Sequence, residues 1–140
     1  MGIKNLIKSD GTEKFAVAYG NNIGIFDGVL TFSGQGRNLA GTKVEMDIFL
    51  DYLVAVNYSN ANQVYDGSTW FTGGAKTRMP IAQYIKTVGT RMYIADLTYI
   101  STNFRSRVWN SDEEGASNNE LKWAYESGTN LSQTAFSKVV

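Results

Sequence analysis

Carboxylates are the residues of this chain that could carry out acid–base chemistry. The 140 residues include neither histidine nor cysteine, which excludes serine–histidine and cysteine–histidine nucleophiles, disulfides and the usual zinc sites. Two carboxylates in one cleft could hydrolyse a glycosidic bond. Asp47 and Asp51 flank an apolar segment, and Asp96 ends the apolar stretch "RMYIA". Asp96 is the first candidate for a ligand-facing carboxylate, with hydrogen bonding to nearby backbone N–H groups as its alternative role.

The segment "VYDGSTW" at 64–70 resembles the Asp box of sialidase-type glycosidases, Ser-x-Asp-x-Gly-x-Thr-Trp. Here Gly67 follows Asp66 directly and Val64 stands where the box has serine, so the spacing is one residue short. A complete box stabilises a turn more often than it forms a catalytic site. We therefore predict that the chain is not an enzyme and that it has no catalytic residue, no metal site and no cofactor. A carboxylate glycosidase is kept as the third functional alternative.

Aromatic side chains could bind a carbohydrate by stacking. Trp123 follows a polar loop and is flanked by Lys122, so Trp123, together with Asp96, is our candidate for ligand binding. Trp70 and Trp109 lie in short apolar runs, and we predict that they fill the core instead.

A repeat organises these residues. Residues 15–34 align without a gap on residues 54–73, and seven positions are identical: Ala16/Ala55, Tyr19/Tyr58, Asn21/Asn60, Asp27/Asp66, Gly28/Gly67, Phe32/Phe71 and Gly34/Gly73. A degraded third copy follows, in which "RMYIAD" corresponds to "YLVAVN" and "SRVWNSD" to "NQVYDG". A period near 40 residues indicates stacked supersecondary units. We expect one domain, 1–140, with units 1–38, 39–78 and 79–128 and a tail 129–140.

Each unit is expected to form four short antiparallel strands, because its segments are rich in β-branched and aromatic residues and end at Asn, Gly, Asp or Ser. In the middle unit these are 43–50, 52–57, 62–65 and 68–73, and in the third unit 81–88, 91–99, 106–112 and 121–128. The repeated Asp-Gly predicts a two-residue type I′ hairpin. Residues 118–127 are the one segment with helix-permissive composition.

Four-stranded antiparallel units at this period are typical of β-propeller blades. The predicted fold is therefore all-β, with about three propeller-like blades; a small β-sandwich or barrel is the alternative. Propellers close with four to eight blades, so three would leave two apolar faces in water. The rest of the ring would come from a longer polypeptide or from further copies of the chain.

Residues 81–112 resemble β-propeller-containing structural proteins of the neck and tail of tailed-bacteriophage virions. The likeness rests on Tyr84-Ile85, on Arg91 to Ala95, on Ser106-Arg107-Val108-Trp109 with Ser111-Asp112, and on Trp123; the chain lacks the proline that such proteins have after the Ser-Asp pair. The resemblance implies a virion building block and identifies no ligand.

Net charge and hydropathy limit the classes of partner that the chain is expected to bind. Thirteen basic residues balance thirteen acidic ones, so no basic face is expected for nucleic acid or an anionic membrane. The longest apolar stretch, "IFLDYLVAV", is interrupted by Asp51 and spans about half a membrane. The sequence predicts a soluble, non-enzymatic assembly module, located in a virion, that self-associates or joins a larger protein assembly. A propeller that binds a carbohydrate or receptor for attachment is the second alternative.

Overall fold

The computed structural model describes residues 2–26, 28, 30–31, 43–49, 51–72, 81–89, 91–99 and 102–110. Most of the described residues are in strands, and none is in a helix. The predicted all-β class is confirmed. The same residues include no helix that could cross a membrane. The possible helix at 118–127, the predicted strand at 121–128 and Trp123 lie outside the described residues.

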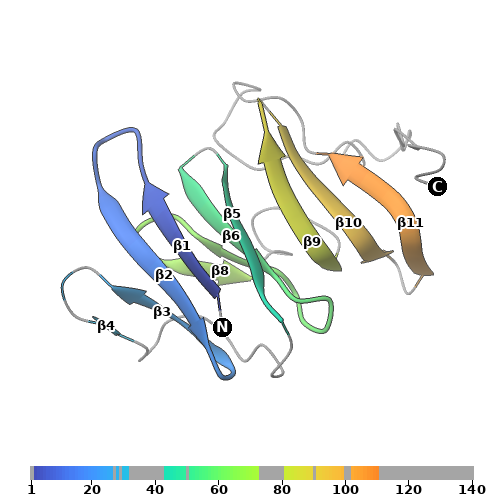
Figure 1. Ribbon diagram of the computed structural model, residues 1–140, viewed down its shortest axis with the longest axis horizontal. Helices are drawn as coiled ribbons and strands as arrows, with labels where there is room; N and C mark the ends of the chain where they lie inside the picture. Colours follow the sequence, from blue (N-terminus) through green and yellow to red (C-terminus); the bar gives the residue numbers. More distant parts are fainter. Residues whose placement is uncertain are drawn as a thin grey trace.

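Three antiparallel sheets follow one another along the chain (Figure 1). In each sheet, neighbouring strands are consecutive in the sequence. The first sheet contains β1 (Gly2–Ile7), β2 (Glu13–Tyr19), β3 (Asn22–Phe26) and β4 (Leu30–Thr31). The second contains β5 (Glu45–Phe49), β6 (Tyr52–Val56), β7 (Gln63–Tyr65) and β8 (Trp70–Thr72). The third contains β9 (Ile81–Val88), β10 (Arg91–Tyr99) and β11 (Thr102–Asn110).

The strands of the second and third sheets lie close to the predicted segments. β9 and β10 have the bounds expected from the sequence. The strand expected at 106–112 begins earlier, at Thr102, which pairs with Tyr99 at the end of β10. Runs of β-branched and aromatic residues therefore located the strands well.

The type I′ hairpin predicted at Asp66-Gly67 is wrong. The last paired residues are Tyr65 and Trp70, so the loop has four residues. Gly67 has a positive φ of 100°, whereas Asp66 is not among the described non-glycine residues with positive φ. The Asp66 carboxylate accepts hydrogen bonds from the N–H groups of Ser68 and Thr69, both at 2.8 Å. Aspartate is favoured at this position because its carboxylate accepts hydrogen bonds from the backbone of the turn, and not because it tolerates a left-handed backbone.

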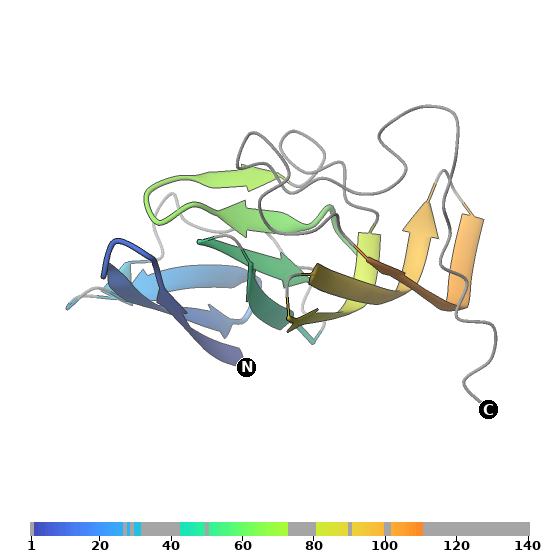
Figure 2. The ribbon, with the colours of Figure 1, turned by 90° about the horizontal axis from the view of Figure 1, so that it is seen from above.

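The three sheets stack face to face, with the second in the middle (Figure 2). One hydrophobic cluster joins the first and second sheets and includes Leu6, Ala16, Ile25, Leu53, Ala55 and Tyr65. The other joins the second and third sheets and includes Phe49, Val54, Val56, Val64, Ile85, Met92 and Ile94. Successive β6 residues thus point into different clusters. β5, the first strand of the second sheet, contacts both β1 and β9, so the first strands of the three sheets lie in a row.

The sequence repeat and the structural repeat differ in phase by one residue along the second strand of each sheet. Ile25 and Val64, aligned in the sequence, each face the sheet that follows in the chain. Ala16 and Ala55 are also aligned, yet both belong to the cluster between the first two sheets. Ala16 therefore faces the sheet that follows its own, whereas Ala55 faces the sheet that precedes its own. The registers explain this, because Ile25 pairs with Ala16 whereas Val64 pairs with Val54. The ungapped alignment therefore does not predict, for every residue of the unit, which neighbouring sheet its side chain faces.

We expect Leu53→Ala to lower the free energy of unfolding by about 2–5 kcal/mol, because it empties a fully buried position between two sheets. Ile7→Ala, on the outside of the first sheet, should change it by less than about 1 kcal/mol. Urea unfolding of dilute samples measures both values. Equal losses for the two variants would contradict the assignment of the core.

Candidate functional site

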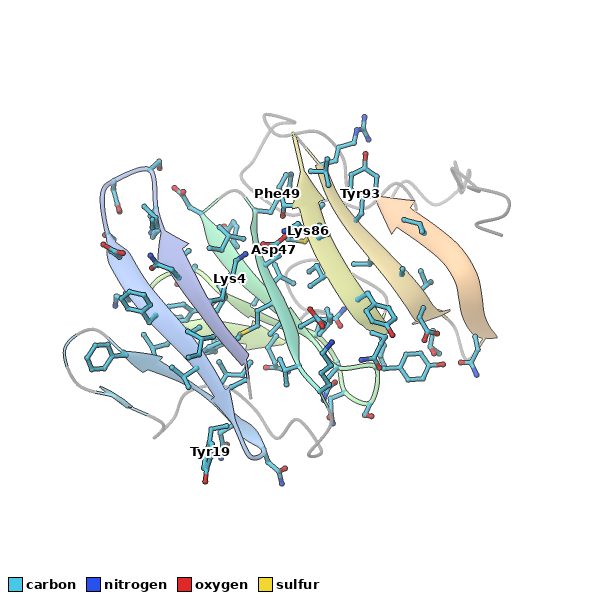
Figure 3. The ribbon with its side chains drawn as sticks, in the orientation of Figure 1. Lys4, Tyr19, Asp47, Phe49, Lys86 and Tyr93 are labelled. Carbon is cyan, nitrogen blue, oxygen red and sulfur yellow. The ribbon has the colours of Figure 1, made fainter. Side chains whose placement is uncertain are left out.

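Asp47 on β5 forms a polar junction among all three sheets. Lys4 Nζ on β1 donates to Asp47 Oδ1 at 2.5 Å, and the Thr87 N–H on β9 donates to Asp47 Oδ2 at 2.6 Å. Lys86 Nζ lies 3.8 Å from the same oxygen. Figure 3 shows the Lys4, Asp47 and Lys86 side chains gathered along the first strands. Since Asp47 is only 5% exposed, the junction is the central buried charge of the described structure.

The Asp47 carboxylate is held in its ionised form. Burial by itself raises its pKa, but the hydrogen bonds from Lys4 and from the Thr87 N–H, with the positive charge of Lys4, outweigh burial and lower the pKa of Asp47 below its ordinary value. A glycosidase general acid requires the opposite shift. Asp47 is therefore suited to joining sheets rather than to donating a proton.

Further hydrogen bonds connect neighbouring sheets at their ends and edges. Asp51, in the β5–β6 turn, accepts the Ser9 N–H at 2.9 Å and also a hydrogen bond from the Ser9 hydroxyl. Thr87 Oγ1 donates to the Ile48 carbonyl at 2.7 Å, and the Tyr58 N–H donates to the Ala82 carbonyl at 2.7 Å. Asp47 and Asp51, which the sequence offered as a carboxylate pair, are thus each engaged in contacts between sheets.

Asp96, at the end of the apolar stretch "RMYIA", lies inside β10 and does not end it. Its φ is 51°, and the pairing of β10 with β11 shifts register between Ala95 and Leu97. The left-handed backbone at Asp96 absorbs this bulge, so the strand continues past it. Asp96 Oδ1 is buried and has no hydrogen-bond partner within the described structure. The role of Asp96 in ligand binding stays a prediction.

Of the three tryptophans considered in the sequence analysis, the structure describes the side-chain surroundings of Trp70. Trp70 packs against the cluster between the first two sheets, with its ring centroid 5.0 Å from that of Tyr65 and the planes tilted by 35°. Its predicted core role is confirmed. Trp109 lies on β11, but the surroundings of its side chain, like all of Trp123, are outside what the structure describes. Carbohydrate stacking by Trp123 remains a prediction.

The outer face of the first sheet carries exposed large apolar side chains. Ile3, Ile7, Phe15, Tyr19 and Phe26 alternate with the buried residues of β1, β2 and β3, and they are between 39% and 68% exposed. Tyr19 points away from the Asp47 junction in Figure 3. On the outer face of the third sheet, Tyr84 and Val88 are 52% and 59% exposed. The stack therefore presents apolar groups at both ends.

Sequence reasoning missed Lys4 and Lys86, the partners of Asp47. A signal was present, because each of the three residues is a charge flanked by apolar residues in a predicted first strand: "GIKNLI", "EMDIF" and "YIKTV". Such a charge is costly unless it is paired. Nothing local in the sequence indicates which charges meet, since that depends on how the sheets stack.

Comparison of the chain with protein-family models, with curated proteins and with solved structures gives no match.

We expect Asp47→Asn to lower the free energy of unfolding at pH 7 by about 1–3 kcal/mol, because Lys4 loses a charged partner while staying partly solvated. The folded-state pKa of Asp47 is lowered, so its contribution is complete above the unfolded value of about 3.9 and is lost as pH falls through the folded value.

The difference between the unchanged chain and Asp47→Asn should therefore shrink as the pH falls below about 5, as measured by urea unfolding at several pH values. Other carboxylates titrate equally in both proteins and cancel. A difference independent of pH would contradict the junction.

Proposed function

We propose that the chain is a non-enzymatic assembly module built of β-propeller blades, and that it serves in the neck or tail of a phage virion through contacts with other proteins. The observation that carries the proposal is the exposed apolar outer face of the first sheet.

The arrangement of the sheets supports blades. Each sheet is an antiparallel meander in which neighbouring strands are consecutive in the sequence. The sheets stack in chain order, and their first strands β1, β5 and β9 lie side by side (Figures 1 and 2). Propeller blades share this plan, with the first strand of each blade nearest the central axis. In a β-sandwich only two sheets face each other, whereas here the middle sheet is covered on both faces.

The energetics support association. An aromatic or large aliphatic side chain offers roughly 150–200 Å² for burial, so five such residues at about half exposure leave on the order of 400 Å² of apolar surface in water. Covering it is worth about 10 kcal/mol at ~25 cal/mol per Å², which equals the stability of an ordinary domain. Patches of this size on soluble proteins mark interaction sites.

The sequence likeness of residues 81–112 to propeller-bearing virion proteins supports a virion as the assembly. The proposal that the chain is a virion component is tested by mass spectrometry of purified phage particles from the cells that encode it. Its absence from such particles would remove the virion from the proposal and leave the assembly module.

We expect the chain to associate reversibly as its concentration rises, and Phe15→Ser with Tyr19→Ser to weaken this association at least tenfold, because both changes remove exposed apolar surface from one face. Sedimentation equilibrium measures the association. Asp10→Ser with Asn21→Ser, at exposed turn positions, is the control and should leave association unchanged. A monomer at every accessible concentration would contradict the proposed function.

A further inference from the structure

We propose that the partner on the outer face of the first sheet is a second copy of this chain, which presents the outer face of its third sheet head to tail. This inference rests on the proposed function, because it names the partner of the same assembly surface.

The faces that meet inside the chain follow one rule. For each sheet, the leading face is the face toward the next sheet in the chain, and the trailing face is the opposite one. The leading face of the first sheet covers the trailing face of the second, and the leading face of the second covers the trailing face of the third. Among the described residues nothing covers two faces: the trailing face of the first sheet and the leading face of the third. A second copy continues the rule by bringing these two faces together.

The leading face of the third sheet carries a positive charge among apolar groups. On β9, alternation places Tyr84, Lys86 and Val88 on this face, opposite Ile85 and Thr87, which contact the second sheet. The Lys86 ammonium is 3.8 Å from Asp47, which is too long for a hydrogen bond. The ammonium is thus in an ion pair with Asp47 without a hydrogen bond, and because the Lys86 side chain is 72% exposed, its charge also remains accessible to solvent.

The trailing face of the first sheet carries a negative charge among apolar groups. Glu13 pairs with Ile7 across β1 and β2, and its carboxylate is held by Asn5 Nδ2 at 2.7 Å. Glu13 is exposed, and Ile7 and Phe15, the cross-strand partners of Glu13 and Asn5, lie beside this polar pair on the same face. The two uncovered faces are therefore complementary in charge as well as apolar.

Lys86 on β9 and Lys4 on β1 are both lysines on the first strand of a sheet. Lys4 pairs with Ala16 and Lys86 with Tyr93, and strand alternation, counted from the buried Leu6 and Ile85, places both on the leading face of their sheet. Inside the chain, Lys4 crosses to the first strand of the next sheet and reaches Asp47. Between copies, the proposed acceptor for Lys86 is the Glu13 carboxylate, which lies on β2, on the trailing face of the second copy's first sheet.

The number of sheets fixes the number of copies. The described residues form three sheets per chain, and propellers close with four to eight blades. Two copies give six blades and close the ring with two identical contacts, whereas three copies would exceed the usual range. The head-to-tail contact therefore predicts a closed dimer.

A charge-swap experiment on the full chain tests the contact. Lys86→Glu places like charges at both contacts of its dimer, and so does Glu13→Lys; each variant alone should dimerise at least tenfold more weakly. In an equimolar mixture, one contact brings together the two substituted positions, which again carry opposite charges, and the other brings together the unchanged Lys86 and Glu13. A mixed dimer of near-original affinity should therefore form. Sedimentation with one variant fluorescently labelled measures this.

Lys43→Glu is the matched control, because the Lys43 side chain is also 72% exposed and also lies beside a carboxylate, that of Glu45. It should not change dimerisation. Circular dichroism of each variant verifies that the sheets are formed. As a second readout in this cysteine-free chain, Val88→Cys and Ile7→Cys chains should form a mixed disulfide on oxidation more readily than either chain does alone.

The outcomes separate the two proposals. A mixed dimer restored by the charge swap supports the head-to-tail contact. Association that neither charge variant weakens overturns this contact but leaves the assembly module standing. Association that both variants weaken and the mixture does not restore also overturns it. An unchanged chain that stays monomeric overturns both the contact and the proposed function.

Discussion

Burial of both faces of the middle sheet is the constraint on which the rest of this structure depends. An antiparallel sheet usually keeps one face in water, and its strands then alternate apolar and polar residues. β6 instead has consecutive apolar residues from Leu53 to Val56, and all four are buried. Such a strand is stable only between two other sheets, so the neighbours must supply apolar faces of their own. The flanking sheets do so, and because each is built on the same plan, each keeps a second apolar face for which the described chain offers no cover.

The strands could be predicted from the sequence because strand formation here is a local property. β-branched and aromatic runs separated by Asp, Asn and Gly set β5, β6, β9 and β10 almost without error. Which way each side chain faces could not be predicted in the same manner. Two residues separate the last paired residues of β2 and β3, Tyr19 and Asn22, whereas seven separate those of β6 and β7, Ala55 and Gln63. Because this difference is an odd number of residues, the pairing is shifted by one residue relative to the ungapped alignment. Alanine fits either face, so the identity of Ala16 and Ala55 conceals the shift.

The polar junction shows the same division between local and non-local information. The carboxylate role of Asp66 is local, because its donors are the N–H groups two and three residues later. The role of Asp47 is not local, because its donors come from residues about 40 positions away on either side, Lys4 and Thr87. A charge in an apolar strand indicates that a partner exists, but only the stacking order of the sheets identifies it. Asp96 is intermediate: its residue type permits left-handed backbone, whereas the bulge that uses it depends on the register of β11.

Apolar burial and the Asp47 junction contribute different things to the stack. Hydrophobic attraction is non-directional. Two flat apolar faces are therefore stabilised by nearly the same free energy when one sheet is displaced by one residue along the other. The bonds of Asp47 to Lys4 and Thr87 require short distances and good alignment, and sliding either neighbour by one residue would break them and leave a carboxylate buried without partners. That penalty exceeds the small differences in apolar contact. The apolar clusters therefore supply most of the free energy that holds the sheets together, and the junction selects one alignment of each sheet on its neighbour. A sheet added to either end of the stack meets the same requirement, since apolar surface alone would hold it without fixing its position.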